Sequence, residues 1–163
     1  FMDNFLGYAC SFCITTGTGS DVFAKLNRKR IGCVINPLSH IYDRNNWTYI
    51  FGYLKNKTTN KYLTIDNMIK EELSNSSNLK NINENYILEK NKSEDITQLV
   101  VETMQKHENK FNVDEIEYDL QKCFWDKYSK LPEKRFENIQ EFKKLDNRIC
   151  NSFLIKNKNI FGL

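Results

Sequence analysis

The sequence FCITTGTGSDVFAKL at residues 12–26, followed by IGCVIN at residues 31–36, decides the predicted fold. It begins and ends with short apolar runs that are partly β-branched and bounded by glycine or polar residues, which is typical of buried strands. Between these runs, Val22, Phe23 and Leu26 fall on one face of a short helix. The pattern predicts a strand, a tight loop, a helix and a second, parallel strand.

The loop between the first strand and the helix is a candidate binding element. Gly17 and Gly19 lack a Cβ atom and can adopt positive φ, so a ligand can approach the backbone closely. Ser20 or Asp21 is suited to cap the helix, and N–H groups at a helix start favour a phosphate or diphosphate. Because the longer dinucleotide fingerprint and a lysine directly after the second glycine are missing, a plain glycine turn is an equally good interpretation. Asp21 would repel a bound diphosphate unless its side chain points back into the cap.

Composition predicts one globular domain. The chain has 163 residues, of which 40% are hydrophobic and 13% aromatic, enough for a single core. Its net charge of +3, from 24 basic and 21 acidic residues, does not indicate a nucleic-acid-binding protein. The sequence contains no run of about 18 apolar residues and no positively charged leader with an apolar region. Transmembrane and secreted classes are therefore not expected.

The cysteines show no zinc-binding pattern, because only one close pair occurs. That pair, Cys10 and Cys13, has redox spacing, yet it leads into a strand instead of opening a helix that would lower the thiol pKa. We expect buried structural thiols, with redox or metal chemistry as the alternative, and a reducing cytosol as the compartment. The five cysteines are Cys10, Cys13, Cys33, Cys123 and Cys150.

The first residues are predicted to be helical, because apolar side chains recur at helical spacing at Met2, Phe5, Leu6 and Ala9. The chain therefore begins in what looks like the middle of a helix. We therefore expect it to be the C-terminal piece of a longer protein.

A polar loop at residues 38–46 follows Pro37, which ends the second strand, and it contains His40. Loops at the carboxyl ends of parallel strands line the ligand crevice of open α/β sheets. In that place His40 could contact a phosphate or donate a proton, and a surface histidine is the alternative.

Residues 47–54 are predicted to form an extended segment packed under a loop. A helix capped by Thr64 or Asp66 follows, then a short buried strand at 86–88 and three further helices. Ser93 is expected to cap the first of these helices, the second begins near Asp114 and the third near Ile139. Their expected buried residues are Ile96, Leu99, Val100 and Met104 in the first; Ile116, Leu120, Cys123 and Phe124 in the second; and Phe142, Leu145, Ile149, Phe153 and Leu154 in the third.

The order of segments resembles the C-terminal part of a family of bacterial glycosyltransferases encoded with surface and capsular polysaccharide genes. The resemblance covers nearly the whole chain, and each block is short. The similar blocks, in order, are residues 12–21, 34–38, 61–64, 89–96, 120–125 (Leu120, Gln121, Phe124 and Trp125) and 148–157 (Arg148, Ile149, Ser152, Phe153, Leu154 and Asn157). One departure is that Gly52 and Tyr53, with Lys55 nearby, stand where the family has a pair of lysines.

The resemblance implies an α/β fold with a Rossmann-like parallel sheet flanked by helices and a helical C-terminal third, as half of a two-domain glycosyltransferase. Residues 1–163 would be the single C-terminal domain that binds the nucleotide-sugar donor, and the N-terminal acceptor domain, absent here, would carry the catalytic base. No metal or other cofactor is expected. The residues expected to bind the donor are Thr16, Gly17, Thr18, Gly19, Ser20 and His40.

The implied function is transfer of a sugar from a nucleotide diphosphate to a growing surface polysaccharide or glycolipid. The expected location is the cytoplasm, with peripheral association at the inner face of the cytoplasmic membrane as an option. No nucleic-acid partner is expected. Two alternatives stay open: half of an epimerase-like sugar-nucleotide enzyme, and a non-catalytic interaction domain of the same fold.

Overall fold

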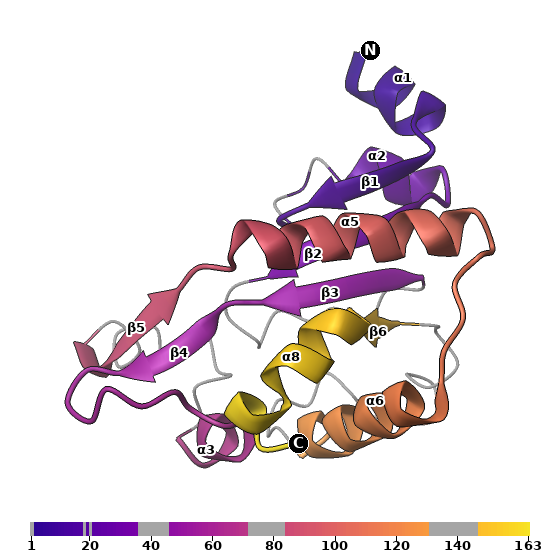
Figure 1. The fold of residues 1–163 in the computed structure, drawn as a ribbon. Helices are drawn as coiled ribbons and strands as arrows, with labels where there is room; N and C mark the ends of the chain where they lie inside the picture. Colours follow the sequence, from indigo (N-terminus) through magenta and orange to yellow (C-terminus); the bar gives the residue numbers. More distant parts are fainter. Residues whose placement is uncertain (1, 18, 20, 36–45, 72–83, 131–146) are drawn as a thin grey trace.

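The computed structural model describes residues 2–17, 19, 21–35, 46–71, 84–130 and 147–163. Within these residues the fold is α/β, with a four-stranded parallel sheet in the order β1-β2-β3-β6 (Figure 1). Its strands are β1 (Phe12–Thr15), β2 (Arg30–Ile35), β3 (Trp47–Phe51) and β6 (Arg148–Ile149). A two-stranded antiparallel ribbon, formed by β4 (Tyr53–Asn56) and β5 (Tyr86–Glu89), extends from the end of β3.

The first strand–helix–strand unit is confirmed. Helix α2 (Val22–Leu26) connects β1 to β2, and Ile14 of β1 pairs in parallel with Gly32 of β2. The expected helix at the start of the chain is α1 (Met2–Ala9), which packs closely on α2: a Cβ atom at Gly7 would lie 2.6 Å from Cβ of Phe23. Both helices form where the apolar spacing predicts them, but the residues that define the spacing are largely exposed, with Phe5 at 53%, Leu6 at 56% and Leu26 at 73%.

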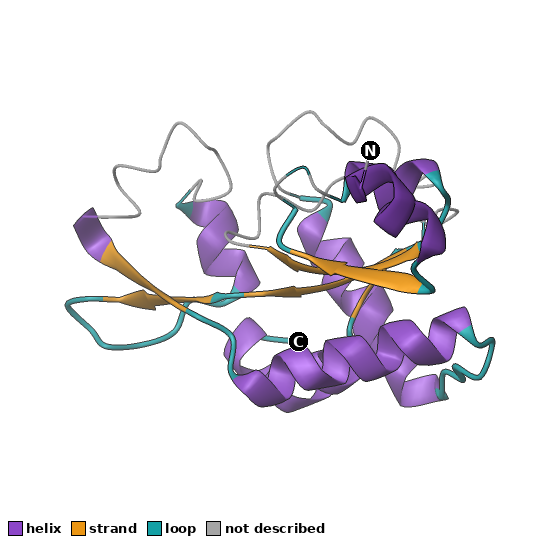
Figure 2. Ribbon diagram, turned by 90° about the horizontal axis from the view of Figure 1, so that it is seen from above, coloured by secondary structure: helices purple, strands orange, loops and turns teal. Residues whose placement is uncertain are grey.

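Helices lie on both faces of the sheet (Figure 2). Helix α5 (Ser93–His107) crosses one face, and α1 lies beyond the other face near β1. The remaining described helices are α3 (Ile65–Lys70), α6 (Glu115–Tyr128) and α8 (Asn151–Phe161), and α8 packs against both α5 and α6. This arrangement is consistent with a Rossmann-like α/β fold.

The segment expected to pack under a loop is instead a central strand. All five residues of β3 are buried, and the strand pairs in parallel with β2 on one side and β6 on the other. Strands buried on both faces form continuous apolar runs, which explains the composition of Trp47–Phe51. The predicted strand at 86–88 exists and Tyr86 is buried as expected, but the expected burial of the other two residues is wrong, because Ile87 is 47% and Leu88 40% exposed.

Helix α5 begins where predicted, but its buried face differs from the predicted one. The expected cap, Ser93, is instead the first helical residue, and Lys92 occupies the N-cap position. Leu99 is buried as expected, whereas Ile96 and Met104 are each 38% exposed. The inward positions between them hold polar residues, among them Glu102 and Thr103.

The two last helices also differ from prediction. Helix α6 begins next to Asp114 as expected, and Asp114 caps it by accepting a hydrogen bond from Glu117 N. Phe124 is buried as expected, but Ile116 is 68% exposed, and Tyr128 is buried in addition. The final helix does not include Ile149, which lies in β6, and it begins at Asn151. The predicted core residues Phe142 and Leu145 lie outside the described residues.

The expected burial of the thiols is met in part. Cys33 and Cys150 are buried, and Cys10, Cys13 and Cys123 are half-buried. Burial, with the nearby Cys10 and Asp21 adding, raises the pKa of Cys13, and burial raises the pKa of Cys150 to about 12. Raised thiol pKa values are the opposite of what redox chemistry requires.

Close approach of α5 to the sheet depends on Gly32. A Cβ atom at this position would lie 2.6 Å from Oγ1 of Thr103 and 2.7 Å from Cδ1 of Ile14. We expect Gly32→Ala to lower the free energy of unfolding by about 1 to 3 kcal/mol, because the helix must shift outward. Denaturant unfolding measures the loss, and Thr103→Ala in the same chain should recover part of it. Strict additivity of the two changes would contradict this explanation.

Candidate functional site at the carboxyl edge of the sheet

The glycine loop follows β1 directly, at the carboxyl edge where open parallel sheets bind ligands. Of the expected donor-binding residues, the structure places Thr16, Gly17 and Gly19 in this loop. Both glycines have positive φ, 75° and 104°, as the loop geometry was expected to require. The other three expected residues, Thr18, Ser20 and His40, lie outside the described residues.

The two glycine N–H groups are engaged within the loop. Gly17 N donates to Oγ1 of Thr15 at 3.0 Å, and Gly19 N donates to Oδ1 of Asp21 at 3.0 Å. Asp21 is only 2% exposed, and although it stands at the N-cap of α2, its side chain makes no cap hydrogen bond. Its carboxylate therefore faces the glycine loop and makes this part of the edge less favourable for an anion.

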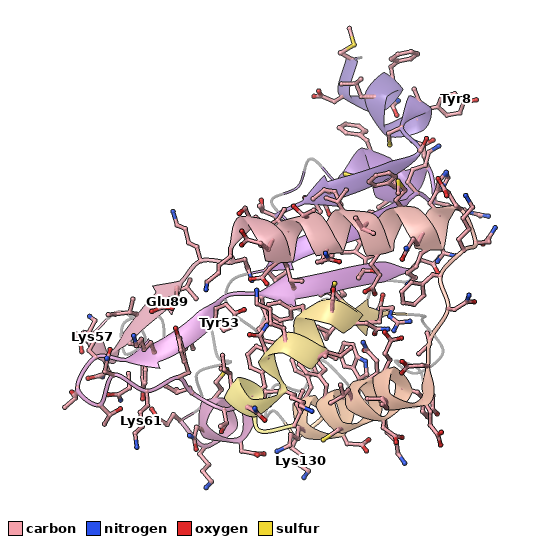
Figure 3. All side chains as sticks on the ribbon, in the orientation of Figure 1. Tyr8, Tyr53, Lys57, Lys61, Glu89 and Lys130 are labelled. Carbon is pink, nitrogen blue, oxygen red and sulfur yellow. The ribbon has the colours of Figure 1, made fainter. Side chains whose placement is uncertain are left out.

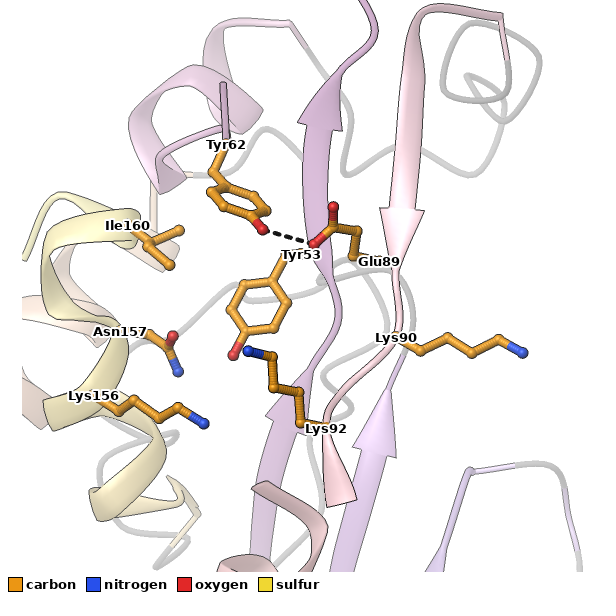
Figure 4. Close-up of a pocket in the computed structure, with 8 residues that line it drawn as sticks. All are labelled: Tyr53, Tyr62, Glu89, Lys90, Lys92, Lys156, Asn157 and Ile160. Carbon is orange, nitrogen blue, oxygen red and sulfur yellow. Dashed lines mark hydrogen bonds between the residues drawn. The ribbon is translucent and has the colours of Figure 1, made fainter. Parts of the chain in front are cut away.

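A cavity of about 260 Å³ lies at the carboxyl end of β3, between the β4–β5 ribbon and α8 (Figure 4). The side chain of Asn91, just before α5, donates to the carbonyl of Phe51 at 2.8 Å and so fixes the start of α5 beside the end of β3. Tyr53 and Glu89 mark this region, at the opposite end of the molecule from Tyr8 on α1 (Figure 3). The cavity is lined by Tyr53, Tyr62, Glu89, Lys90, Lys92, Lys156, Asn157 and Ile160.

One side of the cavity is cationic and is organised by a buried carboxylate. Asp95, 2% exposed, accepts hydrogen bonds from Nζ of Lys156 at 2.6 Å, from the Tyr53 hydroxyl at 3.4 Å and from the backbone N of Lys92 at 3.2 Å. Burial, followed by the charge of Asp95, raises the pKa of Tyr53 to about 12. Tyr53 therefore keeps its proton at neutral pH and adds no negative charge to the cavity.

The other side of the cavity holds an exposed carboxylate. The Tyr62 hydroxyl donates to Oε2 of Glu89 at 2.7 Å, and this bond raises the pKa of Tyr62. Nζ of Lys55 lies 3.5 Å from Oε1 of Glu89 and 5.4 Å from the centre of the Tyr62 ring. The carboxylate thus has a fixed orientation and can still accept hydrogen bonds from a ligand hydroxyl.

Reasoning from residue patterns did not identify this cavity, because its walls come from segments far apart in the chain. The lysine pair expected after the extended segment is missing, and lysines from the start of α5 and from α8 stand near the same strand end. The only signal was the resemblance: its blocks at 61–64, 89–96 and 148–157 each contribute residues to the cavity wall. Its blocks at 120–125 and 148–157 also meet, since Oε1 of Gln121 accepts from Ile149 N at 3.1 Å.

Among the described residues, no group of three or more His, Cys, Asp or Glu side chains is arranged to hold a metal ion. The same part of the chain contains no helix with the length and apolar character needed to cross a membrane. Comparison with known proteins finds no match for this chain among protein-family models, curated proteins or solved structures.

Proposed function

We propose that this chain is the donor-binding half of a glycosyltransferase that takes its sugar from a nucleotide diphosphate. One observation supports the proposal above the others: three segments that resemble the family, separated by tens of residues, surround one lysine- and tyrosine-lined cavity at the carboxyl end of β3. Ligands of open α/β sheets bind at this edge. The acceptor would be a surface polysaccharide or glycolipid held by a second domain.

The glycine loop and the cavity are close enough to share one extended ligand. They follow β1 and β3, which are separated in the sheet by β2 alone. Neighbouring strands lie about 4.8 Å apart and a strand rises about 3.3 Å per residue. The register sets Thr15 level with Tyr49, two residues before the end of β3, so the two strand ends are about 12 Å from each other. A nucleotide-diphosphate sugar can span that distance.

The chemistry required of this half is stabilisation of the departing diphosphate. Negative charge builds on the leaving group during sugar transfer, and fixed cationic groups and N–H donors lower the barrier by opposing it. Lys92 and Lys156 are suited to this role because they stand at the positive end of the α5 dipole. By resemblance the catalytic base belongs to the acceptor domain, and we assign no catalytic residue in this chain.

Titration of the full-length protein with a panel of nucleoside diphosphates tests the proposal. At least one should bind, with an affinity that falls as salt is raised, and the corresponding nucleoside without phosphates serves as the control. Absence of binding across the panel would favour a non-catalytic interaction domain. The internal hydrogen bonds of Gly17 and Gly19 are the observation that favours this second candidate.

Gly19 offers a test of the loop itself. Its φ of 104° is strained for any residue with a Cβ atom, although such an atom would meet nothing within 4 Å. We expect Gly19→Val to reorganise the loop and to weaken binding of the nucleoside diphosphate by at least tenfold without unfolding the domain. Titration calorimetry gives the affinity, and circular dichroism verifies the fold. A folded variant with the parental affinity would remove the loop from the site.

A further inference from the structure

We propose that the cavity between β4, β5 and α8 binds a sugar phosphate: the phosphate lies between Lys92 and Lys156, and the sugar hydroxyls face Glu89. This inference rests on the proposed function, because it assigns the sugar-phosphate part of the donor to one place on the sheet edge. It also departs from the sequence-based expectation that the glycine loop holds the phosphates.

The two sides of the cavity differ in charge in a way that matches the two parts of such a ligand. In Figure 4 the side chains of Lys92 and Lys156 extend toward the Tyr53 hydroxyl, whereas Lys90 points away from the cavity. The bond to Asp95 uses one proton of the Lys156 ammonium and leaves two others for a ligand oxygen. A phosphate placed here would receive charge-assisted hydrogen bonds from two lysines.

The opposite wall suits a sugar ring. The Tyr62 ring, 39% exposed, offers an apolar face to the C–H groups of a pyranose, and the buried Tyr53 ring supports it, with the two centroids 5.9 Å apart. Glu89 stands beside them, and as a carboxylate it accepts hydrogen bonds from hydroxyl groups. A phosphate would be repelled from this side, so the charges fix the direction in which the ligand lies.

The size of the cavity and the state of the glycine loop lead to the same assignment. About 260 Å³ is just below the roughly 300 to 1,000 Å³ of pockets for drug-sized ligands, so a sugar phosphate fits and a whole nucleotide sugar does not. At the glycine loop, the buried carboxylate of Asp21 already occupies the Gly19 N–H. The lysine side also holds a buried carboxylate, Asp95, but Lys156 pairs with it and Lys92 adds a second positive charge. The phosphate therefore has its more favourable partners at this side of the cavity.

The test measures binding of three probes to the full-length protein by titration calorimetry: glucose 1-phosphate, galactose 1-phosphate and inorganic phosphate. We expect at least one sugar phosphate to bind more tightly than inorganic phosphate. Lys92→Ala should weaken its binding at least tenfold, while the matched control Lys90→Ala stays within twofold. Glu89→Gln should reduce the preference for the sugar phosphate over inorganic phosphate.

Lys156→Ala should also weaken binding, but it leaves Asp95 buried without its lysine, so Lys92→Ala is the decisive variant. Equal affinities in Lys92→Ala and Lys90→Ala, or no binding of any probe, would overturn the inference. If a nucleoside diphosphate binds and Lys92→Ala leaves its affinity unchanged, the proposed function stands and this cavity is not its phosphate site. If a sugar phosphate binds in the expected way but no nucleoside diphosphate does, the cavity assignment stands and the donor function falls.

Discussion

Replacing Arg148 with methionine is expected to lower the free energy of unfolding by about 3 to 5 kcal/mol, because it removes the cation that lies directly against the buried carboxylate of Glu102. Nε of Arg148 lies 3.2 Å from Oε1 of Glu102, and the two side chains are only 11% and 6% exposed. The guanidinium also stacks on Phe111, 4.3 Å from the ring centre. Denaturant unfolding measures the loss.

The loss in the free energy of unfolding caused by Arg148→Met should depend on pH. Burial already raises the pKa of Glu102 above its ordinary value of 4.5, although Arg148 acts in the opposite direction. Without Arg148 the folded-state pKa rises further, so the folded state binds a proton that the unfolded state has released. The free energy of unfolding of Arg148→Met should therefore fall as the pH rises above 4.5, and fall more steeply than in the parent.

The matched control is the exposed pair of Lys110 and Glu108, whose Nζ and Oε2 atoms lie 2.8 Å apart at the end of α5. Lys110→Met should change the free energy of unfolding by no more than about 0.5 kcal/mol, because solvent screens an exposed pair. If the two variants lose similar stability, the buried pair does not have the role assigned to it.

Phe51→Ala is the second substitution with a large expected effect, a loss of about 3 to 5 kcal/mol. Phe51 is fully buried at the end of β3. The centroid of its ring lies 5.7 Å from that of Phe124, 5.2 Å from that of Phe153 and 4.8 Å from that of Phe161. Removing it opens a cavity where β3, α6 and α8 meet. Unfolding in denaturant, followed by tryptophan fluorescence, measures the loss.

Tyr118→Ala is the comparison, since Tyr118 is an aromatic residue of α6 that is 65% exposed. This substitution should lower the free energy of unfolding by no more than about 0.5 kcal/mol. A cost for Phe51→Ala below that for Tyr118→Ala would show that the aromatic cluster does not form the centre of the core.

Elements held together by neighbours in sequence could be predicted. The apolar runs in β1 and β2 and the helix between them have clear periods, and the unit closes within residues 12–35. The sequence offers Thr64 or Asp66 as the cap of α3, and in the structure Oγ1 of Thr64 accepts from Asn67 N at 3.2 Å. Such signals are local because the partners lie within one turn or one connection.

Elements that depend on distant partners could not be predicted. The inward face of α5 carries Glu102 because Arg148 and the backbone of Asn151 satisfy it, the latter at 2.7 Å. Hydrophobic periodicity does not indicate that Glu102 is paired with Arg148, 46 residues later in the chain. The pattern therefore predicts a buried face that contains Ile96 and Met104. The prediction for Ile149 is wrong for the same reason: local spacing predicts a helix, whereas its strand partner, Tyr49, lies 100 residues earlier in the sequence.

The candidate site shows the same division. The positive φ values of Gly17 and Gly19 follow from the lack of a Cβ atom and could be anticipated, but the capture of the Gly19 N–H by Asp21 could not. Whether an aspartate caps its helix or turns back into the preceding loop depends on packing that a sequence does not display. The lysine cavity depends wholly on tertiary structure, because β4, β5 and α8 meet only after folding.

The position of β6 has a consequence for the newly made chain. Oδ1 of Asn147, just before β6, accepts from Trp47 N, a residue 100 positions earlier. The β6 side of β3 therefore lacks its strand partner until residues 148–149 have been synthesised. At about 5 to 20 residues per second, translation leaves the apolar edge of Trp47–Phe51 open for about 5 to 20 seconds. An open edge of this kind pairs readily with strands of other chains. The nascent protein therefore has a defined interval in which it is most prone to aggregate and most in need of a chaperone.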